Sequence, residues 1–372
     1  MPIFLNIFFS LAISFTIVYF IIPGIIKAAR AKKLFDVPNS RSAARQVVPT
    51  LGGIAIMAGF ILGLIISSDS FGIDDLKYLF ASVTVMFVIG LNDDILGSSA
   101  RRKLVIELLM AFYLVILGDY RFTDLHGILG INQIGYISGV ILSVFAIVGI
   151  VNAVNLIDGI DGLASGIGIL ISTVYGFWFL NAGDYIYSLT CFSLTGSLGA
   201  FFLYNVFGKQ NKIFMGDTGS LIVGTIIAIL TIHFNEFVPT SVLPVSGLPA
   251  ISLAIIIVPV VDTIRVFTIR LMSKKSPFSP DMNHLHHNLL RLTNSHLKSS
   301  LIIIGTNGIF ILIAITLVDQ MGNNLLFFSL LVSGLLMADI PVWILKWSEK
   351  NPAHFGENKS VFELISLKKK AG

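Results

Sequence analysis

The chain is poor in cysteine and in charged residues. Of its 372 residues, 12% are Asp, Glu, Lys or Arg, about half the charged fraction of an average soluble domain. The single cysteine, Cys191, excludes an internal disulfide and a metal site built from cysteines. The first twenty residues lack a basic segment and a small-residue cleavage site, so we interpret them as a retained span rather than a cleaved signal.

Long apolar runs take the place of the missing charge. The composition is 55% hydrophobic, with a mean hydropathy of +0.87, and several runs reach the roughly 20 residues that cross a bilayer core. We therefore predict an all-α, polytopic membrane protein with about eleven transmembrane helices. The predicted spans are 3–26, 50–67, 78–92, 104–118, 137–157, 163–180, 186–207, 219–234, 248–272, 301–318 and 325–345.

The basic residues predict the topology. With the N-terminus outside, 23 of the 25 Lys and Arg residues fall in cytoplasmic loops or at adjoining helix ends, and only Lys77 and Arg121 do not. Residues 1–345 are expected to form a single transmembrane catalytic domain, followed by a basic cytoplasmic tail over 346–372. The net charge of +4 then reflects topology and attraction to anionic lipid rather than binding to nucleic acid.

Nearly all polar clusters fall in the predicted cytoplasmic loops. A channel or transporter is expected to place ionisable groups near the middle of the membrane. Clusters at one membrane surface favour an enzyme whose acceptor lies in the lipid and whose donor comes from the cytosol. A transporter of sugar nucleotides or lipids is the alternative from a different class.

The first cytoplasmic loop carries Asp36, Arg41 and Arg45, followed by Pro49 and the pair Gly52–Gly53. The arginines could clamp phosphates. The glycine pair at a helix entry, with free backbone N–H groups, could seat an anion. Taken alone, this loop is more simply explained as a basic loop that obeys the inside rule.

Two adjacent aspartates, Asp93 and Asp94, end the third span. Burying both in a membrane helix is costly without a cation, which a hard divalent metal would supply. Otherwise one of the two would have a raised pKa and could act as a general base. The basic run Arg101–Lys103 follows and either steers an anionic lipid headgroup or anchors the topology.

The strongest local signal is a run of polar residues at every third position through the end of span five. Asn152, Asn155, Asp158 and Asp161 lie on nearly the same helix face. The intervening glycines, Gly159 and Gly162, allow the chain to unwind and approach a ligand closely. Packing explains this pattern poorly, so we predict a functional site here.

The segment before span eight contains Phe214 and Asp217. Asp217 is either an N-cap of the span or a metal ligand. Phe214 either stacks on a base or lies in the membrane interface.

The largest cytoplasmic loop carries His284, His286 and His287 after Asp281. Zinc is disfavoured because the chain offers no partner cysteine and its acidic groups are oxygen ligands suited to magnesium. We expect these imidazoles to line a diphosphate pocket. The other four histidines, which we do not interpret as functional, are His126, His233, His296 and His354.

These clusters, in this order, resemble the polyprenyl-phosphate N-acetylhexosamine-1-phosphate transferase family. The resemblance runs from about Asp36 to Leu290 and rests mainly on Asn155–Leu163 and Phe214–Ser220. It implies that Asp93 and Asp94 are the paired catalytic aspartates and that Asp217 binds the metal. It places Phe214 at the uracil-stacking position.

The same resemblance implies further site residues. Asn155, Asp158 and Asp161 match the nucleotide-proximal motif, and the three clustered histidines match the motif assigned to the donor diphosphate. Asp36 with the two nearby arginines matches the first cytoplasmic motif. One departure is Gly97, where some members carry a third acid.

The implied reaction moves a sugar 1-phosphate from a UDP-N-acetylhexosamine to polyprenyl (undecaprenyl) phosphate at the cytoplasmic face of a bacterial inner membrane. Mg²⁺ is the expected cofactor, with Mn²⁺ as a substitute, held by Asp217 with Asp93 or Asp94. The histidine loop favours UDP-GlcNAc. A phospho-MurNAc-pentapeptide transferase is the alternative within the family. Direct attack, a covalent aspartyl intermediate and a homodimer are all left open.

Overall fold

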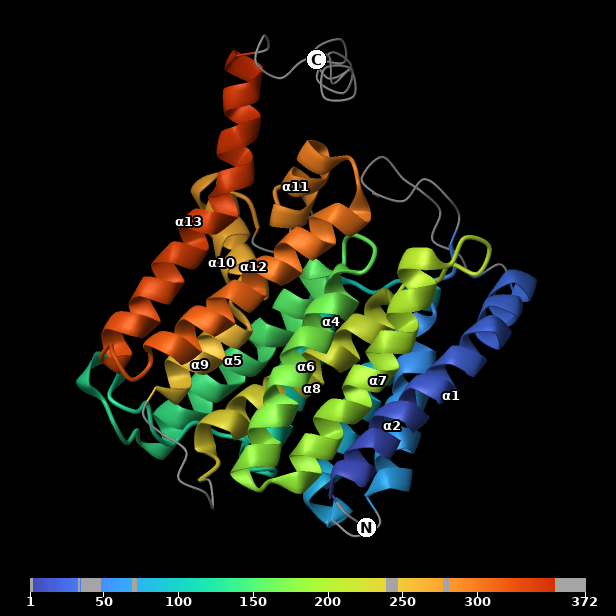
Figure 1. Cartoon of the computed structure of the whole chain (residues 1–372), viewed down its shortest axis with the longest axis horizontal. Helices are drawn as coiled ribbons and strands as arrows, with labels where there is room; N and C mark the ends of the chain where they lie inside the picture. Colours follow the sequence, from blue (N-terminus) through green and yellow to red (C-terminus); the bar gives the residue numbers. More distant parts are fainter. Residues whose placement is uncertain are drawn as a thin grey trace.

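The computed structural model describes residues 3–32, 34, 48–68, 72–238, 247–276 and 282–351. Within these ranges the chain is built from helices and connecting loops, and its only β pairing is an isolated bridge between Asp124 and Gln133. Asp36, Arg41, Arg45 and Asp281 lie outside the described residues. The helices form one elongated bundle (Figure 1). The predicted all-α class is confirmed.

Each predicted apolar block coincides with a helix or a helix pair. The helices are α1 (Ile3–Lys32), α2 (Gly52–Ser67), α3 (Lys77–Leu96), α4 (Ala100–Ile116), α5 (Tyr136–Ile157), α6 (Leu163–Ala182), α7 (Tyr185–Phe207), α8 (Gly216–Glu236), α9 (Leu248–Ile255), α10 (Ile257–Met272), α11 (Leu285–Thr293), α12 (His296–Leu317) and α13 (Asn323–Lys350). Two short 3₁₀ helices, η1 (Ile73–Leu76) and η2 (Ile128–Gly130), complete the described elements. The helix α11 was not predicted, because it lies in a polar loop.

Eight of the described helices are long and apolar enough to cross a membrane, and the bent pair α9–α10 makes a ninth candidate. The helices α2 and α4, with 16 and 17 residues, are shorter. Large apolar side chains point outward, including Phe20, Phe145 and Leu312, each more than 60% exposed. A surface of this kind suits contact with lipid rather than water. The chain is a multi-pass membrane protein, while its predicted count of eleven spans stays a prediction.

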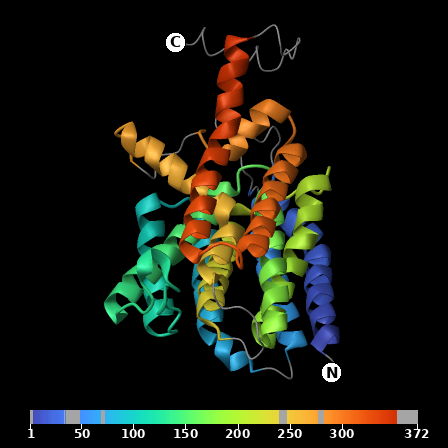
Figure 2. The same cartoon turned by 60° about the vertical axis from the view of Figure 1, so that its left-hand side comes forward.

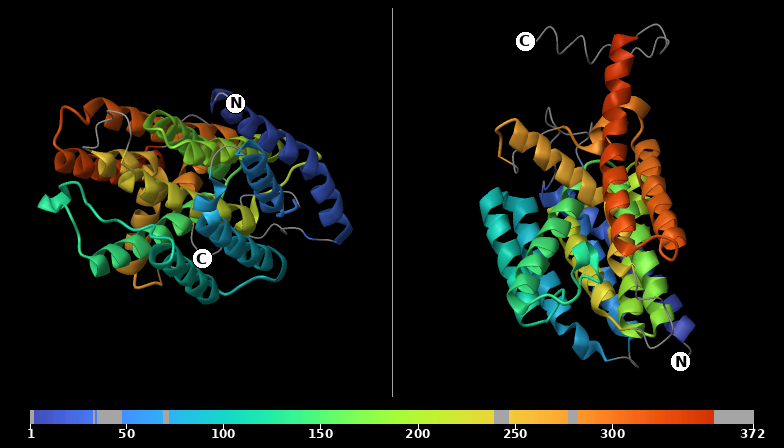
Figure 3. Two further views of the ribbon diagram at one scale, coloured as in Figure 1. Left: turned by 90° about the horizontal axis from the view of Figure 1, so that it is seen from below. Right: turned by 90° about the vertical axis from the view of Figure 1, so that its left-hand side faces the viewer.

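The two ends of the bundle differ in the residues they carry. We call the end that contains Asp93, Asp158 and Asp217 the aspartate end, and the other the opposite end. The first helix begins at the opposite end, whereas α13 ends at the aspartate end and projects beyond its neighbours (Figures 1, 2 and 3). This arrangement fits an odd number of crossings.

A sharp bend replaces the single span predicted for 248–272. The axes of α9 and α10 differ by 76°. Pro259 explains the break, because it lacks an N–H group and its ring clashes with the carbonyl four residues earlier, that of Ile255. Asn307 of α12 satisfies the freed backbone groups: its amide donates to the Ile255 carbonyl at 2.9 Å and accepts from the Val258 N–H at 3.2 Å.

The helix α8 forms the centre of the bundle and positions the site. It contacts α2, α3, α5 and α6 along its length, and most of its residues are buried. Two glycines allow its neighbours to approach its first turn. A Cβ on Gly90 of α3 would collide with the Thr218 backbone, and one on Gly53 of α2 would collide with Gly219. The N-terminus of α8 is thereby held against the ends of α2 and α3.

Candidate active site

Asp94 caps the N-terminus of α8 from the neighbouring helix. Its carboxylate accepts hydrogen bonds from the N–H groups of Asp217 and Thr218, at 2.8 and 3.0 Å, and from the Thr218 hydroxyl at 2.5 Å. The first amide groups of a helix have no partners within the helix and attract negative charge. Asp94 therefore uses both oxygens to fix α8 on α3.

The entry to α2 is hydrogen-bonded to the segment before α8. The N–H groups of Gly52 and Gly53 donate to the carbonyls of Phe214 and Met215, both at 3.0 Å, and the Phe214 N–H donates to the Pro49 carbonyl at 2.8 Å. We expected the N–H groups of this glycine pair to be free, and this expectation is wrong. The pair serves to lock the Phe214 segment in place and does not offer an anion seat.

A cluster of five polar side chains lies beside this cap. Asn155 of α5 donates from its amide to the Asp217 carboxylate at 2.6 Å and to the Ser220 hydroxyl at 2.7 Å. The Lys103 ammonium of α4 lies 3.2 Å from the Asp217 carboxylate, 3.7 Å from that of Asp93 and 3.3 Å from the Asn155 amide oxygen. The carboxylates of Asp93 and Asp217 therefore lie next to the same ammonium group. Lys103 is thus the cation shared by two acids.

The turn between α5 and α6 holds two aspartates in different surroundings. Asp161 lies 2.6 Å from the Lys212 ammonium and 3.2 Å from His296 Nδ1. Burial alone would raise the pKa of Asp161, but its hydrogen bonds and ion pairs with these two residues outweigh burial and lower the pKa. Asp161 is therefore a carboxylate at neutral pH.

Asp158 has no comparable support. No hydrogen bond to its carboxylate is formed by any residue that the structure describes. Burial raises the pKa of the Asp158 carboxyl to about 7, and the negative charges of Asp217, Asp94 and Asp161 add to the rise. Asp158 can therefore gain or lose a proton near neutral pH.

The histidine motif meets this turn. A Cβ on Gly159 would collide with His286 Nε2, so the glycine is required for the ring to pack there. His286 is 1% exposed, and neither ring nitrogen has a hydrogen-bond partner among the described residues. Burial lowers the pKa of His286 well below its usual value, and the neighbouring histidines lower it further. The ring is a neutral imidazole that packs on Gly159, the residue after Asp158, and no described residue bonds to it.

Comparisons with known proteins identify the family of the chain. The glycosyl transferase family 4 profile matches residues 76–235. A probable undecaprenyl-phosphate N-acetylglucosaminyl 1-phosphate transferase of Bacillus subtilis is 31% identical over 310 residues, which are 82% of this chain and 83% of the relative. The chain belongs to glycosyl transferase family 4.

Other members of glycosyl transferase family 4 are similar to the same extent. The undecaprenyl-phosphate alpha-N-acetylglucosaminyl 1-phosphate transferase of Escherichia coli K12 is 30% identical over 274 residues, covering 71% of each chain. The protein of that name from Haemophilus influenzae is 32% identical over 262 residues, covering 69% of this chain and 72% of its own. The family match includes Asp93, Asp158 and Asp217, while the histidine motif lies beyond it.

Nothing in the sequence indicated that three residues would lie beside these acids: Lys212 and His296 were not singled out for a role, and Lys103 was noted only as part of the basic run Arg101–Lys103. Lys103 stands in a basic run that topology alone explains, and only the packing of α4 on α5 turns it toward the acids. Lys212 also lies over the Phe214 ring, 5.7 Å from its centre. His296 stands alone in sequence, and it reaches Asp161 because α12 begins at that point. Spacing along the chain gave no signal for any of them.

The oxygen atoms of this candidate site are of the kind that binds a hard cation. Among the described residues, no group of three or more His, Cys, Asp or Glu side chains is arranged to hold a metal ion alone. Asp93 and Asp217 nevertheless face one another and offer oxygen atoms, the ligands that Mg²⁺ prefers. Mg²⁺ usually binds through one or two carboxylates together with substrate phosphates. The residues present therefore fit a magnesium ion that arrives with a phosphorylated substrate.

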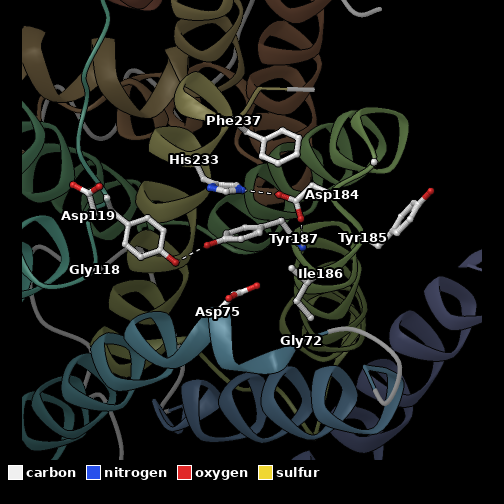
Figure 4. Close-up of a pocket in the computed structure, with 12 residues that line it drawn as sticks. Gly72, Asp75, Gly118, Asp119, Asp184, Tyr185, Ile186, Tyr187, His233 and Phe237 are labelled. Carbon is white, nitrogen blue, oxygen red and sulfur yellow. Dashed lines mark hydrogen bonds and ion pairs between the residues drawn. The ribbon is translucent and has the colours of Figure 1, made fainter. Parts of the chain in front are cut away.

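A second polar region lies at the opposite end (Figure 4). It is a pocket of about 630 Å³ lined by Gly72, Asp75, Gly118, Asp119, Tyr120, Gly183, Asp184, Tyr185, Ile186, Tyr187, His233 and Phe237. Its buried polar groups are paired with one another. His233 lies 2.6 Å from the Asp184 carboxylate, its ring stacks on Tyr187 with centres 3.6 Å apart, and the hydroxyls of Tyr187 and Tyr120 are 2.5 Å apart.

Proposed function

We propose that the chain transfers N-acetylglucosamine 1-phosphate from UDP-GlcNAc to undecaprenyl phosphate and releases UMP. An oxygen of the lipid phosphate attacks the donor's β-phosphorus, and the bond from that phosphorus to the UMP oxygen breaks. The products are UMP and the lipid-linked sugar diphosphate. The names of the relatives support the substrates of this reaction.

One observation carries the proposal. Residues from α3, α4, α5 and α8 meet around Asp217, and the adjacent turn of Asp158 and Gly159 touches His286. Acidic groups, a lysine and a neutral imidazole to which no described residue bonds thus lie close together. A reaction between two phosphates needs positive charge and positioning more than covalent chemistry.

The charge of each side chain indicates its role in the reaction. Lys103 and Lys212 supply positive charge near the donor and acceptor phosphates. Phe214, held by the α2 entry, offers an aromatic face to the uracil. Asp158 takes the proton of the lipid phosphate, since its carboxylate is not committed to any described donor and titrates near neutral pH. Attack is direct, without an aspartyl intermediate.

Magnesium is proposed as the cofactor, with Mn²⁺ as a substitute. Asp217 and Asp93 would hold the ion, and Asp94 would act indirectly because its oxygens already cap α8. When bound, the ion supplies positive charge to the donor diphosphate and to the departing UMP.

We place the site at the cytoplasmic face of a bacterial inner membrane, because the basic residues predict that topology. The reaction would then be the first membrane step of a cell-surface polysaccharide pathway. A pentapeptide transferase is disfavoured, since the relatives described above act on N-acetylglucosamine by name.

Purified protein in detergent tests the proposal. UMP release is followed with a panel of UDP-sugars, with and without undecaprenyl phosphate and Mg²⁺. We expect release from UDP-GlcNAc only when both are present. Equal release from other UDP-sugars would refute the choice of sugar, and no release from any of them would refute transferase activity.

A further inference from the structure

The described part of α10 carries three buried charged side chains to which the proposed reaction gives no role. Asp262, Arg265 and Arg270 are 3%, 7% and 3% exposed. Burying a charge is costly unless it is paired. All three reach the segment that begins the histidine motif.

The contacts anchor this segment at consecutive residues. The Asp262 carboxylate accepts from the Leu285 N–H at 2.8 Å and lies 2.9 Å from His284 Nδ1. Arg265 donates to the Asn283 carbonyl at 2.8 Å, and its other side lies 2.6 Å from the Asp339 carboxylate of α13. The start of α11 is thereby held by α10, whose direction is set by the bend at Pro259.

The partners of His284 determine where its proton lies. An ionised carboxylate only accepts hydrogen bonds, so His284 Nδ1 must carry a proton to bond with Asp262. An arginine only donates, so His284 Nε2, 3.3 Å from Arg270 Nη2, must be the unprotonated nitrogen. Both nitrogens of His284 are occupied by α10, in contrast to those of His286.

We propose that Asp262 is a positioning residue for donor binding: it fixes His284 and the first turn of α11, so that His286 faces the turn of Asp158 and Gly159. His284 is then a latch rather than a ligand of the donor. The part of this inference that concerns the donor rests on the proposed function. Residues that orient a ligand from behind commonly contribute 10–100-fold to affinity or activity.

The variant Asp262→Asn tests the inference without changing side-chain volume. The new amide can take two orientations. In one its NH₂ group faces the Leu285 N–H, and in the other it faces the protonated nitrogen of His284. In both cases two hydrogen-bond donors face each other and one hydrogen bond is lost. We expect the KM for UDP-GlcNAc to rise roughly 10-fold. The KM for undecaprenyl phosphate should stay within about twofold, because that substrate does not depend on His286.

Asp184→Asn is the matched control, since it alters the other buried Asp–His pair at the opposite end. It should leave both KM values unchanged. Equal KM values for UDP-GlcNAc in Asp262→Asn and the unmodified protein would overturn the proposal. So would an equal rise for both substrates, which a merely structural role would produce.

A second readout does not depend on enzyme activity. In unmodified protein labelled with ¹⁵N-histidine, solid-state NMR should show His284 protonated at Nδ1 alone, with its signal assigned by its loss in His284→Gln. Protonation at Nε2 would refute the latch. If His284 has the expected form but no UDP-sugar is consumed, the proposed function fails and the latch stands. If Asp262→Asn transfers the sugar phosphate normally with an unchanged KM, the proposed function stands and the positioning role of Asp262 fails.

Discussion

Each end of the bundle contains a buried Asp–His pair, Asp262 with His284 at the aspartate end and Asp184 with His233 at the opposite end. The pairs have similar lengths, 2.9 and 2.6 Å. Their surroundings differ. Around Asp184 the aromatic and polar side chains bond or stack with one another. Beyond His284 lies His286, whose two ring nitrogens have no hydrogen-bond partner among the described residues.

A cavity by itself does not identify the functional end. A cavity of about 630 Å³ lies beside Asp184, at the other end of the bundle from Asp217, yet its buried polar side chains bond with one another. A buried polar group without a partner costs free energy, so a protein keeps one where a ligand completes it. The buried ring of His286, with two nitrogens that no described residue satisfies, therefore favours the aspartate end as the place where a ligand binds, and the following changes test this difference.

The largest effect is expected from Asp217→Asn. The amide keeps an oxygen for the Asn155 hydrogen bond but removes the negative charge shared with Asp93 and Lys103. We expect UMP release to fall at least about 100-fold, as it does when a group that stabilises the transition state is removed. The unfolding temperature should change little, and activity close to that of unmodified protein at saturating Mg²⁺ would contradict the assignment.

Lys103→Met should distinguish the contribution of the Lys103 ammonium from that of the proposed Mg²⁺ ion. Without the ammonium, the carboxylates of Asp93 and Asp217 repel each other, so the unfolding temperature in Mg²⁺-free buffer should fall by several degrees. Added Mg²⁺ should then stabilise the variant more than it stabilises the unmodified protein. The neighbouring Arg102→Met, at an exposed position, is the control. Equal stabilisation of all three proteins by Mg²⁺ would exclude a metal at this pair.

Asp158→Asn should remove a pH dependence of the free energy of unfolding. Because the folded-state pKa is raised from 3.8 to about 7, the neutral form is favoured by folding. This contribution to stability is complete below about pH 4 and is lost as the pH rises to about 7. Each pKa unit corresponds to about 1.4 kcal/mol, so above pH 7 the variant should unfold at a higher temperature than the unmodified protein.

The activity of the unmodified protein should rise with pH over the range in which its stability falls. If Asp158 accepts the proton, kcat should rise with pH through about 7, and this limb should be absent from the residual activity of Asp158→Asn. The ratio of the two rates at pH 6 and pH 8 gives the measurement. A rising limb of the same size in both proteins would assign the proton to another group.

The helices were predictable because lipid selects long apolar runs, and all eleven blocks coincide with helices. The bend between α9 and α10 had a signal in Pro259. However, proline also occurs inside α1 and α13, which remain single helices. The bend is stabilised by Asn307, about fifty residues away in sequence, and no local sequence pattern predicts that contact.

The candidate site was predictable in its carboxylates but not in their roles. Adjacent residues such as Asp93 and Asp94 look equivalent in sequence, yet one lies beside Lys103 and the other caps α8. The same holds for His284 and His286. Which member of such a pair faces a ligand depends on the angle at which helices cross, and that angle depends on distant contacts such as Gly90 with Thr218.

The smallest effect on activity is expected at the opposite end. Asp184→Asn leaves the Asp184–His233 pair without its charge and weakens the start of α7, where Asp184 accepts from the Tyr187 N–H. This should cost about 1–3 kcal/mol of stability and change UMP release by less than about twofold. Differential scanning fluorimetry and the UMP assay on one preparation give both numbers. A large loss of activity with intact folding would mean that the paired end also serves the reaction, and pairing would then no longer distinguish the two ends.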